Sequence, residues 1–361
     1  MSTVNIGNST IVIGILARDC INGLKNNITR VESLGRMFKD YHVIVYENDS
    51  KDGTKECVLQ WAKDNSNVIA ISEEFNQLTI PKKSKHVSKP TKSEWRIQKM
   101  AVFRNRILEE VNKRFSPDYF CFIDIDIESF APSSIVEAIE KAPEDWGALC
   151  ASGHLYYSTP DGNDYPANFQ YDAYAFFPEG YFPERKGKRA ISHKWHLMSA
   201  WSAEKLVRQN DFSSCRSAFN GLAVYKWNIV KSLHYSAVQN KDLKNCNSAL
   251  CEHLSLHHAI LSQGYKIYIT RIIEVVYLHK RATIPRRFNN KYNVLLAKLY
   301  LSIYSKDWSP RKIINHFQRS NPLKVLIKDK NVKKIYKGRK LPKKWVNKLA
   351  RAKTSFELSQ K

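Results

Sequence analysis

The 361-residue sequence lacks any apolar run close to the ~20 residues that a membrane-spanning helix needs. An apolar stretch near the N-terminus covers residues 11–17, but no basic region precedes it and no cleavage site follows it. We therefore expect this stretch to be a first core strand and not a signal peptide.

Cysteine pairs with the spacing of metal or redox sites are also missing. The seven cysteines are scattered, and none forms a C-x-x-C pair. This pattern is typical of reduced thiols and favours a cytoplasmic protein over a secreted disulfide scaffold. With 43% hydrophobic and 12% aromatic residues, the chain is expected to be globular, with one large core plus an appendage or two modest domains.

Acidic residues become scarce after Lys280. From there to Lys361, 24 Lys and Arg residues stand against three acids, a net charge of +21 out of +24 for the whole chain. The preceding part is therefore almost neutral. We predict a domain boundary near residue 280, with one folded domain over residues 1–280 and a basic, mainly helical extension over residues 281–361.

The extension is expected to contain an apolar helical segment at residues 292–304 and a last helix that begins at Pro342. That helix places Trp345, Leu349 and Phe356 on one face, with Lys and Arg elsewhere. Such a helix suits an anionic membrane surface, which predicts a cytoplasmic protein that is peripheral on the cytosolic membrane face. The alternative is a helix that packs on the folded domain and leaves its basic face in solvent.

The same positive charge would attract phosphate backbones, so a nucleic-acid-binding protein or a metal-dependent nuclease is a second function class. The extension contains no recognised nucleic-acid motif. The acidic strand described below also lacks the further acidic ligands that a two-metal nuclease is expected to have. We therefore regard nucleic acid as the weaker alternative partner.

Before Lys280, apolar strands alternate with helical segments. Strands are expected at residues 11–17, 42–47, 68–72, 119–124, 146–151, 222–225 and 272–278, and helices at 22–38, 54–63, 95–113 and 252–263, with a further helix that has Ser133 or Ser134 as its N-cap. This alternation implies βαβ units. The predicted fold class is α/β, with a Rossmann-like, mostly parallel sheet flanked by helices.

The strand at 119–124 leads directly into two carboxylates, in the order Tyr-Phe-Cys-Phe-Ile-Asp-Ile-Asp. A continuous apolar run is typical of a strand buried on both faces, and ligands bind at the carboxyl ends of such strands. In an extended chain Asp124 and Asp126 point to the same side, so both can face one divalent cation. Carboxylate and phosphate oxygens suit Mn²⁺ or Mg²⁺ and not zinc. The alternative is a strand that ends in a polar loop.

Other polar side chains lie at comparable positions. Glu47 and Asp49 close the second strand, where they can accept from a ribose hydroxyl or a base N–H, or simply form a polar turn. Arg104, on the helix before the acidic strand, can neutralise a diphosphate or pair with a surface acid. Arg96 and Lys99 on the same helix share that ambiguity.

The segments VIVYENDSKDGT, RIQKMAVFRNRIL and YFCFIDIDIE together resemble the nucleotide-sugar half of a GT-A glycosyltransferase. Within that fold the sequence is most similar to the fungal capsule-associated α-1,3-mannosyltransferase family and its bacterial and viral relatives. The likeness continues through SAFNGLAVYKW, CEHLSLHHAILSQGYKIYI and VVYLHK and covers about residues 10–280. It implies a GT-A catalytic domain, a divalent cation, and a nucleotide-sugar donor such as GDP-mannose. It also implies a glycan or lipid-linked glycan acceptor, as in surface-polysaccharide biosynthesis.

The resemblance also implies roles for single residues. It places Glu252 and His253 beside the acceptor: in an inverting reaction Glu252 or His253 would be the general base, and in a retaining one Glu252 would orient the sugar or the acceptor. His279 matches a histidine that closes the metal site in many relatives, or is a surface residue. Asn220 and Gly221 allow a sugar close to the backbone, or form a simple turn.

Two further expectations concern the surface. Residues 153–196 are rich in Tyr, Phe, Pro and Gly, and we predict that they form an acceptor-binding loop, because aromatic faces bind sugar rings. His257 and His258 are expected to be ordinary residues on the surface of a helix.

Overall fold

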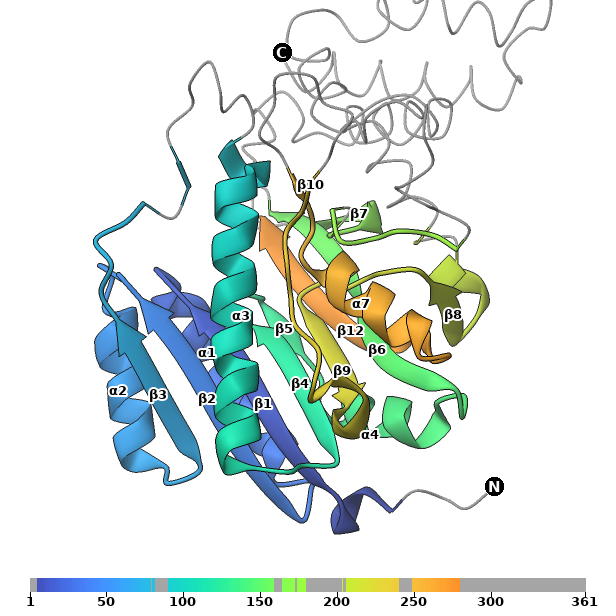
Figure 1. Cartoon of the computed structure of the whole chain (residues 1–361), viewed down its shortest axis with the longest axis horizontal. Coiled ribbons are helices and arrows are strands. Elements are labelled where there is room, and N and C mark those ends of the chain that lie inside the picture. The colour runs from blue at the N-terminus through green and yellow to red at the C-terminus, as the bar shows by residue number, and fades with distance from the viewer. Residues whose placement is uncertain are drawn as a thin grey trace, which may run out of the picture. The chain divides into compact units, whose positions relative to one another are not determined.

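Figure 1 shows the computed structural model, which describes residues 5–78, 80–81, 90–158, 164–172, 174–179, 203, 206–239 and 249–279. Met1–Leu155 and Asn168–Tyr277 form one compact unit, which contains the candidate site. The basic extension lies outside the described residues, so its helices, its membrane role and the boundary near residue 280 stay predictions. Among the described residues, no helix has both the length and the apolar character to cross a bilayer.

The helices and strands occur in the predicted alternation. The strands are β1 (Thr10–Ala17), β2 (Asp40–Asn48), β3 (Val68–Glu73), β4 (Tyr119–Asp124), β5 (Ser129–Phe130), β6 (Trp146–Ser158), β7 (Asp164–Gln170), β8 (Phe212–Cys215), β9 (Leu222–Lys226), β10 (Val238–Gln239), β11 (Ala249–Leu250) and β12 (Lys266–His279). The helices are α1 (Ile21–Gly35), α2 (Thr54–Asp64), α3 (Glu94–Arg114), α4 (Pro132–Lys141), α6 (Trp227–Val230) and α7 (His253–Ser262), with 3-10 turns at Ile6–Asn8 and Pro90–Lys92.

In the described part of the chain, the main sheet has the strand order β3-β2-β1-β4-β9-β6-β12-β5, with β7 paired to β6 and β8 paired to β12. Strands β3, β2, β1 and β4 are parallel, whereas β9 runs antiparallel between β4 and β6. The register pairs Leu16 with Asp124 and Ala17 with Glu47. The carboxyl ends of β1, β2 and β4 therefore meet at one edge. The predicted α/β fold with helices on the sheet is confirmed.

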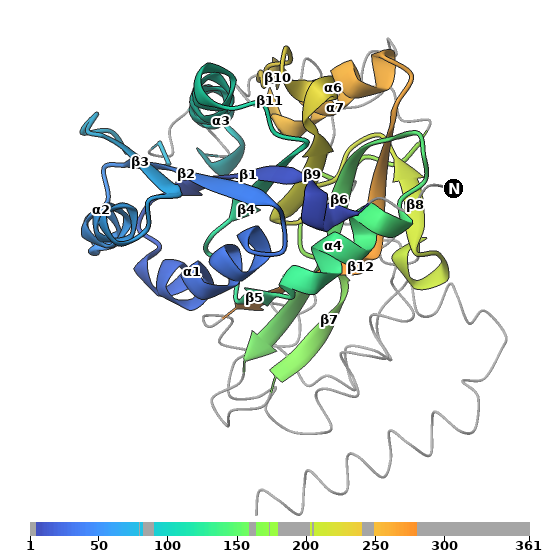
Figure 2. The same cartoon turned by 90° about the horizontal axis from the view of Figure 1, so that it is seen from below.

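The sheet is buried on both faces because its central strands have no polar side. Ile13 and Ile15 of β1 and Phe120 and Phe122 of β4 are each at most 1% exposed. Figure 2 shows α1, α2 and α4 on one face of the parallel strands and α3, α6 and α7 on the other. Removing these apolar residues from water is the main stabilising contribution of such a core.

Helix α3 has a charged residue, Arg104, on its buried face. Ile97, Ala101, Leu108 and Val111 are buried at the spacing of successive helical turns, and Arg104 is buried at the same phase, with 3% of its surface exposed. Ser93 caps the start of the helix by accepting from the backbone N–H of Arg96. An arginine at a core position must be paired, so the packing of α3 brings a buried cation under the edge of the sheet.

Two local predictions were wrong. Helix α4 has Ala131 as its N-cap and begins at Pro132, which supplies a fixed φ and needs no hydrogen-bond partner at this position. The aromatic stretch from residue 153 does not begin as a loop, because β6 continues through it to Ser158 and β7 pairs with β6. Most of the remainder of that stretch lies outside the described residues.

Candidate active site

A cavity of about 310 Å³ lies at the carboxyl ends of β1, β2 and β4. Its lining includes Asp124 and Asp126 from the acidic strand and the turn after it, Arg96 and Lys99 from α3, and Arg18 from the end of β1. This is the edge at which open α/β sheets bind ligands. The sequence-predicted carboxylates and the two α3 cations therefore lie around one cavity.

The two aspartates differ in how the backbone presents them. Strand β4 ends at Asp124, and Asp126 lies in the turn that follows, so the extended-chain argument does not hold for the pair. Helix α1 fixes this turn: the buried Asn27 amide donates to the Ile127 carbonyl at 2.7 Å. A Cβ on Gly23 would lie 2.6 Å from the Asp126 Cα, so α1 packs directly against the turn backbone. Both carboxylates still reach the cavity.

The electrostatics of the pair favour a cation. Burial raises the pKa of Asp124 to about 7; Arg104 opposes this shift and Asp126 adds to it. Partial loss of surrounding water also raises the pKa of Asp126, although the residue as a whole is exposed. Two carboxylate oxygen donors in this setting fit a hard divalent ion such as Mg²⁺ or Mn²⁺.

The described part of the chain does not by itself provide a complete set of metal ligands. It contains no group of three or more His, Cys, Asp or Glu side chains that could hold a metal ion. His279 is the last residue of β12, and its side chain lies outside the described part. The assignment of Asp124, Asp126 and His279 as metal ligands therefore stays a prediction, and the two aspartates would need further ligands to complete a coordination shell.

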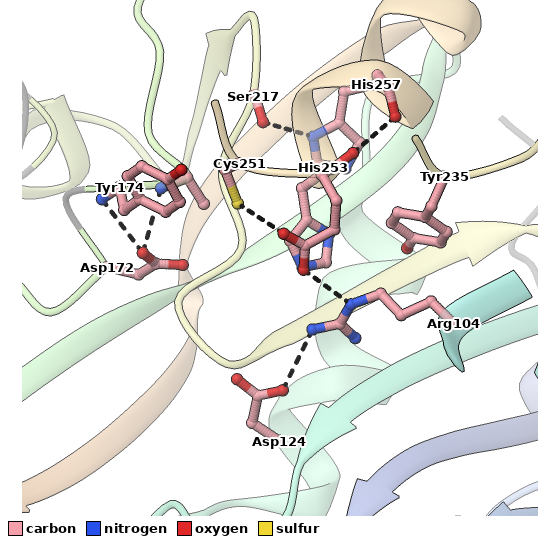
Figure 3. Close-up of polar contacts among 12 residues, drawn as sticks. Arg104, Asp124, Asp172, Tyr174, Ser217, Tyr235, Cys251, His253 and His257 are labelled. Carbon is pink, nitrogen blue, oxygen red and sulfur yellow. Dashed lines mark hydrogen bonds and ion pairs between the residues drawn. The ribbon is translucent and has the colours of Figure 1, made fainter. Parts of the chain in front are cut away.

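Arg104 connects Asp124 with Glu252 (Figure 3). Its Nε donates to Glu252 Oε1 at 3.2 Å, and its Nη2 lies 3.5 Å from Asp124 Oδ1. The guanidinium also lies 5.0 Å from the Phe122 ring centre and 4.9 Å from that of Phe219. The alternative that Arg104 pairs with a surface acid was wrong, because its partners are Asp124, which lines the cavity, and the buried Glu252.

Asp124 and Glu252 keep the buried Arg104 side chain positively charged. Burial alone would lower the pKa of Arg104, but Asp124 and Glu252 raise it above its ordinary value. Arg104 is not among the described residues that line the cavity. Its predicted contact with a diphosphate stays a prediction, and the geometry supports a role in holding the two carboxylates.

Glu252 is the N-cap of α7 and His253 is its first residue, and neither is among the described residues that line the cavity. Glu252 is 5% exposed and accepts from Arg104 and, at 3.6 Å, from the Cys251 thiol. His253 is 1% exposed and stacks on Phe219 at 3.9 Å. Burial, and next the charge of Arg104, keep the pKa of His253 well below its usual value, so its ring is neutral. A general base must reach the proton that it removes, so this geometry favours an orienting role for Glu252.

Glu47 and Asp49 have protein partners that account for their positions. Glu47 is fully buried and accepts from the Ser50 N–H at 2.9 Å and from the Ser72 hydroxyl at 2.6 Å. Asp49 accepts from two backbone N–H groups of the loop after β3, at 2.6 and 2.8 Å, and pairs with Arg18 at 3.2 Å. These bonds support the polar-turn alternative. Contacts of either residue with a nucleotide stay predictions.

Asn220 and Gly221 form a turn with positive φ angles of 53° and 83°. The Asn220 amide donates to the Ala151 carbonyl at 2.8 Å, and its side-chain oxygen accepts from the Asp172 N–H at 3.0 Å. A Cβ on Gly221 would lie 1.8 Å from the Tyr277 hydroxyl oxygen. Tyr277 therefore occupies the space that the glycine leaves, which accounts for the glycine without a sugar.

Among the cavity residues that were not singled out from the sequence, Arg18 and Tyr171 have side chains suited to a ligand. Arg18 directly follows β1, and its place at the same sheet edge as Asp124 was the available indication. Tyr171 lies in the aromatic stretch and is 41% exposed, with its ring stacked on Tyr277 at 3.4 Å and 12°. An exposed ring held in this way has a face on which a sugar or a base could stack.

His257 was predicted to lie on a helix surface, and this was wrong. It is fully buried, with its ring nitrogens 2.9 Å from the Ser217 hydroxyl and 3.1 Å from the Tyr225 hydroxyl. Burial lowers the pKa of His257 to about 3. His258, one residue further, is exposed.

We expect His257→Gln to reduce the acid sensitivity of the fold. Because the folded pKa of about 3 lies below the unfolded value of 6.5, the stabilisation is complete above pH 6.5 and is lost as the pH falls from there toward 3. This residue contributes a slope of up to about 1.4 kcal/mol per pH unit to the unfolding free energy. Urea unfolding between pH 7 and 5 measures the slope. His258→Gln is the matched control and should keep the wild-type slope, whereas equal slopes for both variants would contradict the assignment.

The parallel half-sheet, the antiparallel strand beside β4 and the carboxylates at its edge fit the GT-A fold, the class of structure that the sequence predicts. The particular family follows from the sequence: the family model described as Cryptococcal mannosyltransferase 1 matches residues 11–256, more than half of the chain. The chain belongs to this family. The predicted resemblance to capsule-associated mannosyltransferases is confirmed, and the protein is a glycosyltransferase.

Solved structures with a related chain path were also found. The mannosyltransferase PcManGT from Pyrobaculum calidifontis, in complex with GDP-Man and Mn²⁺, is 12% identical with a TM-score of 0.44, over 98% of this chain and 81% of that one. TarS 1-349 from S. aureus is 12% identical with a TM-score of 0.37, over 90% and 77%. GalNAc-T7 with UDP, GalNAc and Mn²⁺ is 12% identical with a TM-score of 0.40, over 93% and 59%. No curated protein matches the sequence.

Proposed function

We propose that this glycosyltransferase moves a mannosyl group from GDP-mannose to a glycan or lipid-linked glycan acceptor, with Mn²⁺ or Mg²⁺ at the D-x-D carboxylates. The family supports the mannosyl assignment. The observation that carries the donor site is the cavity at the carboxyl edge, lined by Asp124 and Asp126 on one side and by basic residues of α3 on another.

The proposed roles follow from this arrangement. Asp124 and Asp126, with His279 as a further ligand, would hold the cation, which supplies Lewis-acid stabilisation of the departing diphosphate when it is bound. Arg104 fixes Asp124 and Glu252 relative to each other. Glu252 orients the reactants through this network and does not remove a proton, which suits a reaction that retains configuration.

The donor assignment predicts a selective thermal shift. GDP and GDP-mannose should raise the melting temperature more than the UDP and CMP counterparts, and more with Mn²⁺ than in EDTA. A ligand at 100 times its Kd that binds only the folded state adds about 2.7 kcal/mol to the unfolding free energy. A larger shift with a UDP-sugar would overturn the mannosyl donor and leave the transferase assignment intact. Release of GDP from GDP-mannose in the presence of Mn²⁺ is the matching activity measurement.

The alternative of a nucleic-acid-binding protein or nuclease depends on the basic extension, which lies outside the described residues. No observation on the described residues favours it over sugar transfer. The acceptor and the membrane surface also stay predictions, because both depend on segments that the structure does not describe.

A further inference from the structure

Three basic side chains around the cavity have buried nitrogen atoms that lack a hydrogen-bond partner among the described residues. These atoms are Lys99 Nζ, Arg96 Nε and Arg18 Nε. All three residues line the cavity that contains Asp124 and Asp126. Buried donors are almost always paired, so three orphaned cationic donors at one cavity indicate a missing acceptor.

The neighbouring acids do not supply that acceptor. Asp124 is paired with Arg104. The Asp49 carboxylate already accepts from two backbone N–H groups and pairs with one nitrogen of Arg18, Nη1. Neither Lys99 nor Arg96 has an acidic partner within 4.0 Å in the described part of the chain, where the ion pairs that involve Arg18 are those to Asp19 and Asp49.

Lys99 is fixed in place although it has no polar partner. Its ammonium lies 5.2 Å from the ring centre of Trp95 and 5.4 Å from that of Phe103. These cation–π contacts stabilise the charge within the cavity wall. Burial, and next the repulsion from Arg18, lower the pKa of Lys99, so an anion would relieve an unfavourable local charge.

The cavity therefore has two kinds of wall. The α3 wall and the end of β1 carry positive charge. The end of β4 and the turn after it carry two carboxylates, which do not form a complete metal site within the described residues. A ligand that satisfies both walls has several anionic oxygens for the cations, and it shares some of them with a divalent ion at the carboxylates. A diphosphate group has this chemistry.

We propose that Lys99, Arg96 and Arg18 form an anion site that binds the diphosphate of the donor without a divalent cation, and that the cation then binds to the complex of protein and diphosphate. The identity of the diphosphate as part of a sugar donor rests on the proposed function. The site itself rests on the orphaned donors. Because coupling between two ligands is reciprocal, the diphosphate raises the affinity for the metal by the same factor as the metal raises that for the diphosphate.

The test is calorimetric titration of the full chain with inorganic pyrophosphate in EDTA, at fixed ionic strength. Wild type should bind, and Lys99→Met should weaken the Kd by at least about tenfold. Lys113→Met is the matched control: Lys113 lies on the same helix, is exposed and pairs only weakly, 3.9 Å from Glu110, so its Kd should equal that of wild type. Arg96→Met should weaken binding in the same direction as Lys99→Met. Adding Mn²⁺ should tighten pyrophosphate binding to wild type.

Two outcomes would overturn the anion site. One is equal pyrophosphate binding by wild type and Lys99→Met, which would assign the binding to other basic residues such as those of the extension. The other is no binding in EDTA by a wild-type protein that hydrolyses GDP-mannose with Mn²⁺, which leaves the proposed function standing. Lys99-dependent pyrophosphate binding without turnover of any nucleotide sugar would support the anion site and contradict the proposed function.

Discussion

Asp126→Ala is expected to reduce metal-dependent release of the nucleotide by at least about 100-fold while the protein stays folded. The carboxylate is one of the two that line the cavity, so its loss removes one of the two predicted carboxylate ligands for the cation. The fold should tolerate the change because Asp126 is exposed, and its turn is held through backbone groups by Asn27 and α1. The measurement is GDP release from GDP-mannose as a function of Mn²⁺ concentration, together with urea unfolding.

The control for this prediction is Asp64→Ala, which removes an exposed carboxylate at the end of α2 that accepts only from Gln60 in the described structure. It should leave both turnover and unfolding unchanged. If Asp126 is a metal ligand, excess Mn²⁺ should restore part of the lost activity. Full activity in a folded Asp126→Ala protein would remove the metal assignment.

The sequence predicted the fold and the location of the site because both depend on short-range patterns. Apolar runs such as residues 11–17 and 119–123 are typical of buried strands, and their alternation with helices implies parallel βαβ units. In such a sheet, polar residues at the carboxyl ends of the strands meet at one edge, so the sequence places Asp124 and Asp126 at the ligand-binding edge.

The partners of single side chains could not be predicted in this way. The bonds of Asp49 come from a loop 26 and 27 residues away, and those of Arg104 from acids 20 and 148 residues away. Helical phase did contain one usable indication, since Arg104 lies in register with Ala101 and Leu108. His257 gave no such indication because α7 is buried on more than one side, so its sequence has no clear polar face.

Arg104→Met is expected to lower the free energy of unfolding by about 3–5 kcal/mol, because it leaves the carboxylates of Asp124 and Glu252 without the buried cation that pairs with them. Arg104 is 3% exposed and Glu252 is 5% exposed, so water cannot replace the lost pairing. The matched control is Arg106→Met on the same helix. Arg106 is exposed and pairs with Glu109 at 3.4 Å, and such surface pairs contribute about 0–1 kcal/mol. Urea unfolding at pH 7 measures both variants.

Two further variants separate charge from packing at Arg104. Arg104→Lys keeps the charge but cannot contact both acids with a planar fork, so we expect an intermediate loss of stability. Adding Glu252→Gln to Arg104→Met should recover part of the lost stability, because it removes one of the unpaired charges, and the double-mutant cycle measures that coupling. A loss for Arg104→Met no larger than that for Arg106→Met would show that the pairing does not stabilise the fold. An equal loss in the presence and absence of Glu252→Gln would instead attribute the effect of Arg104 to its packing against Phe122 and Phe219.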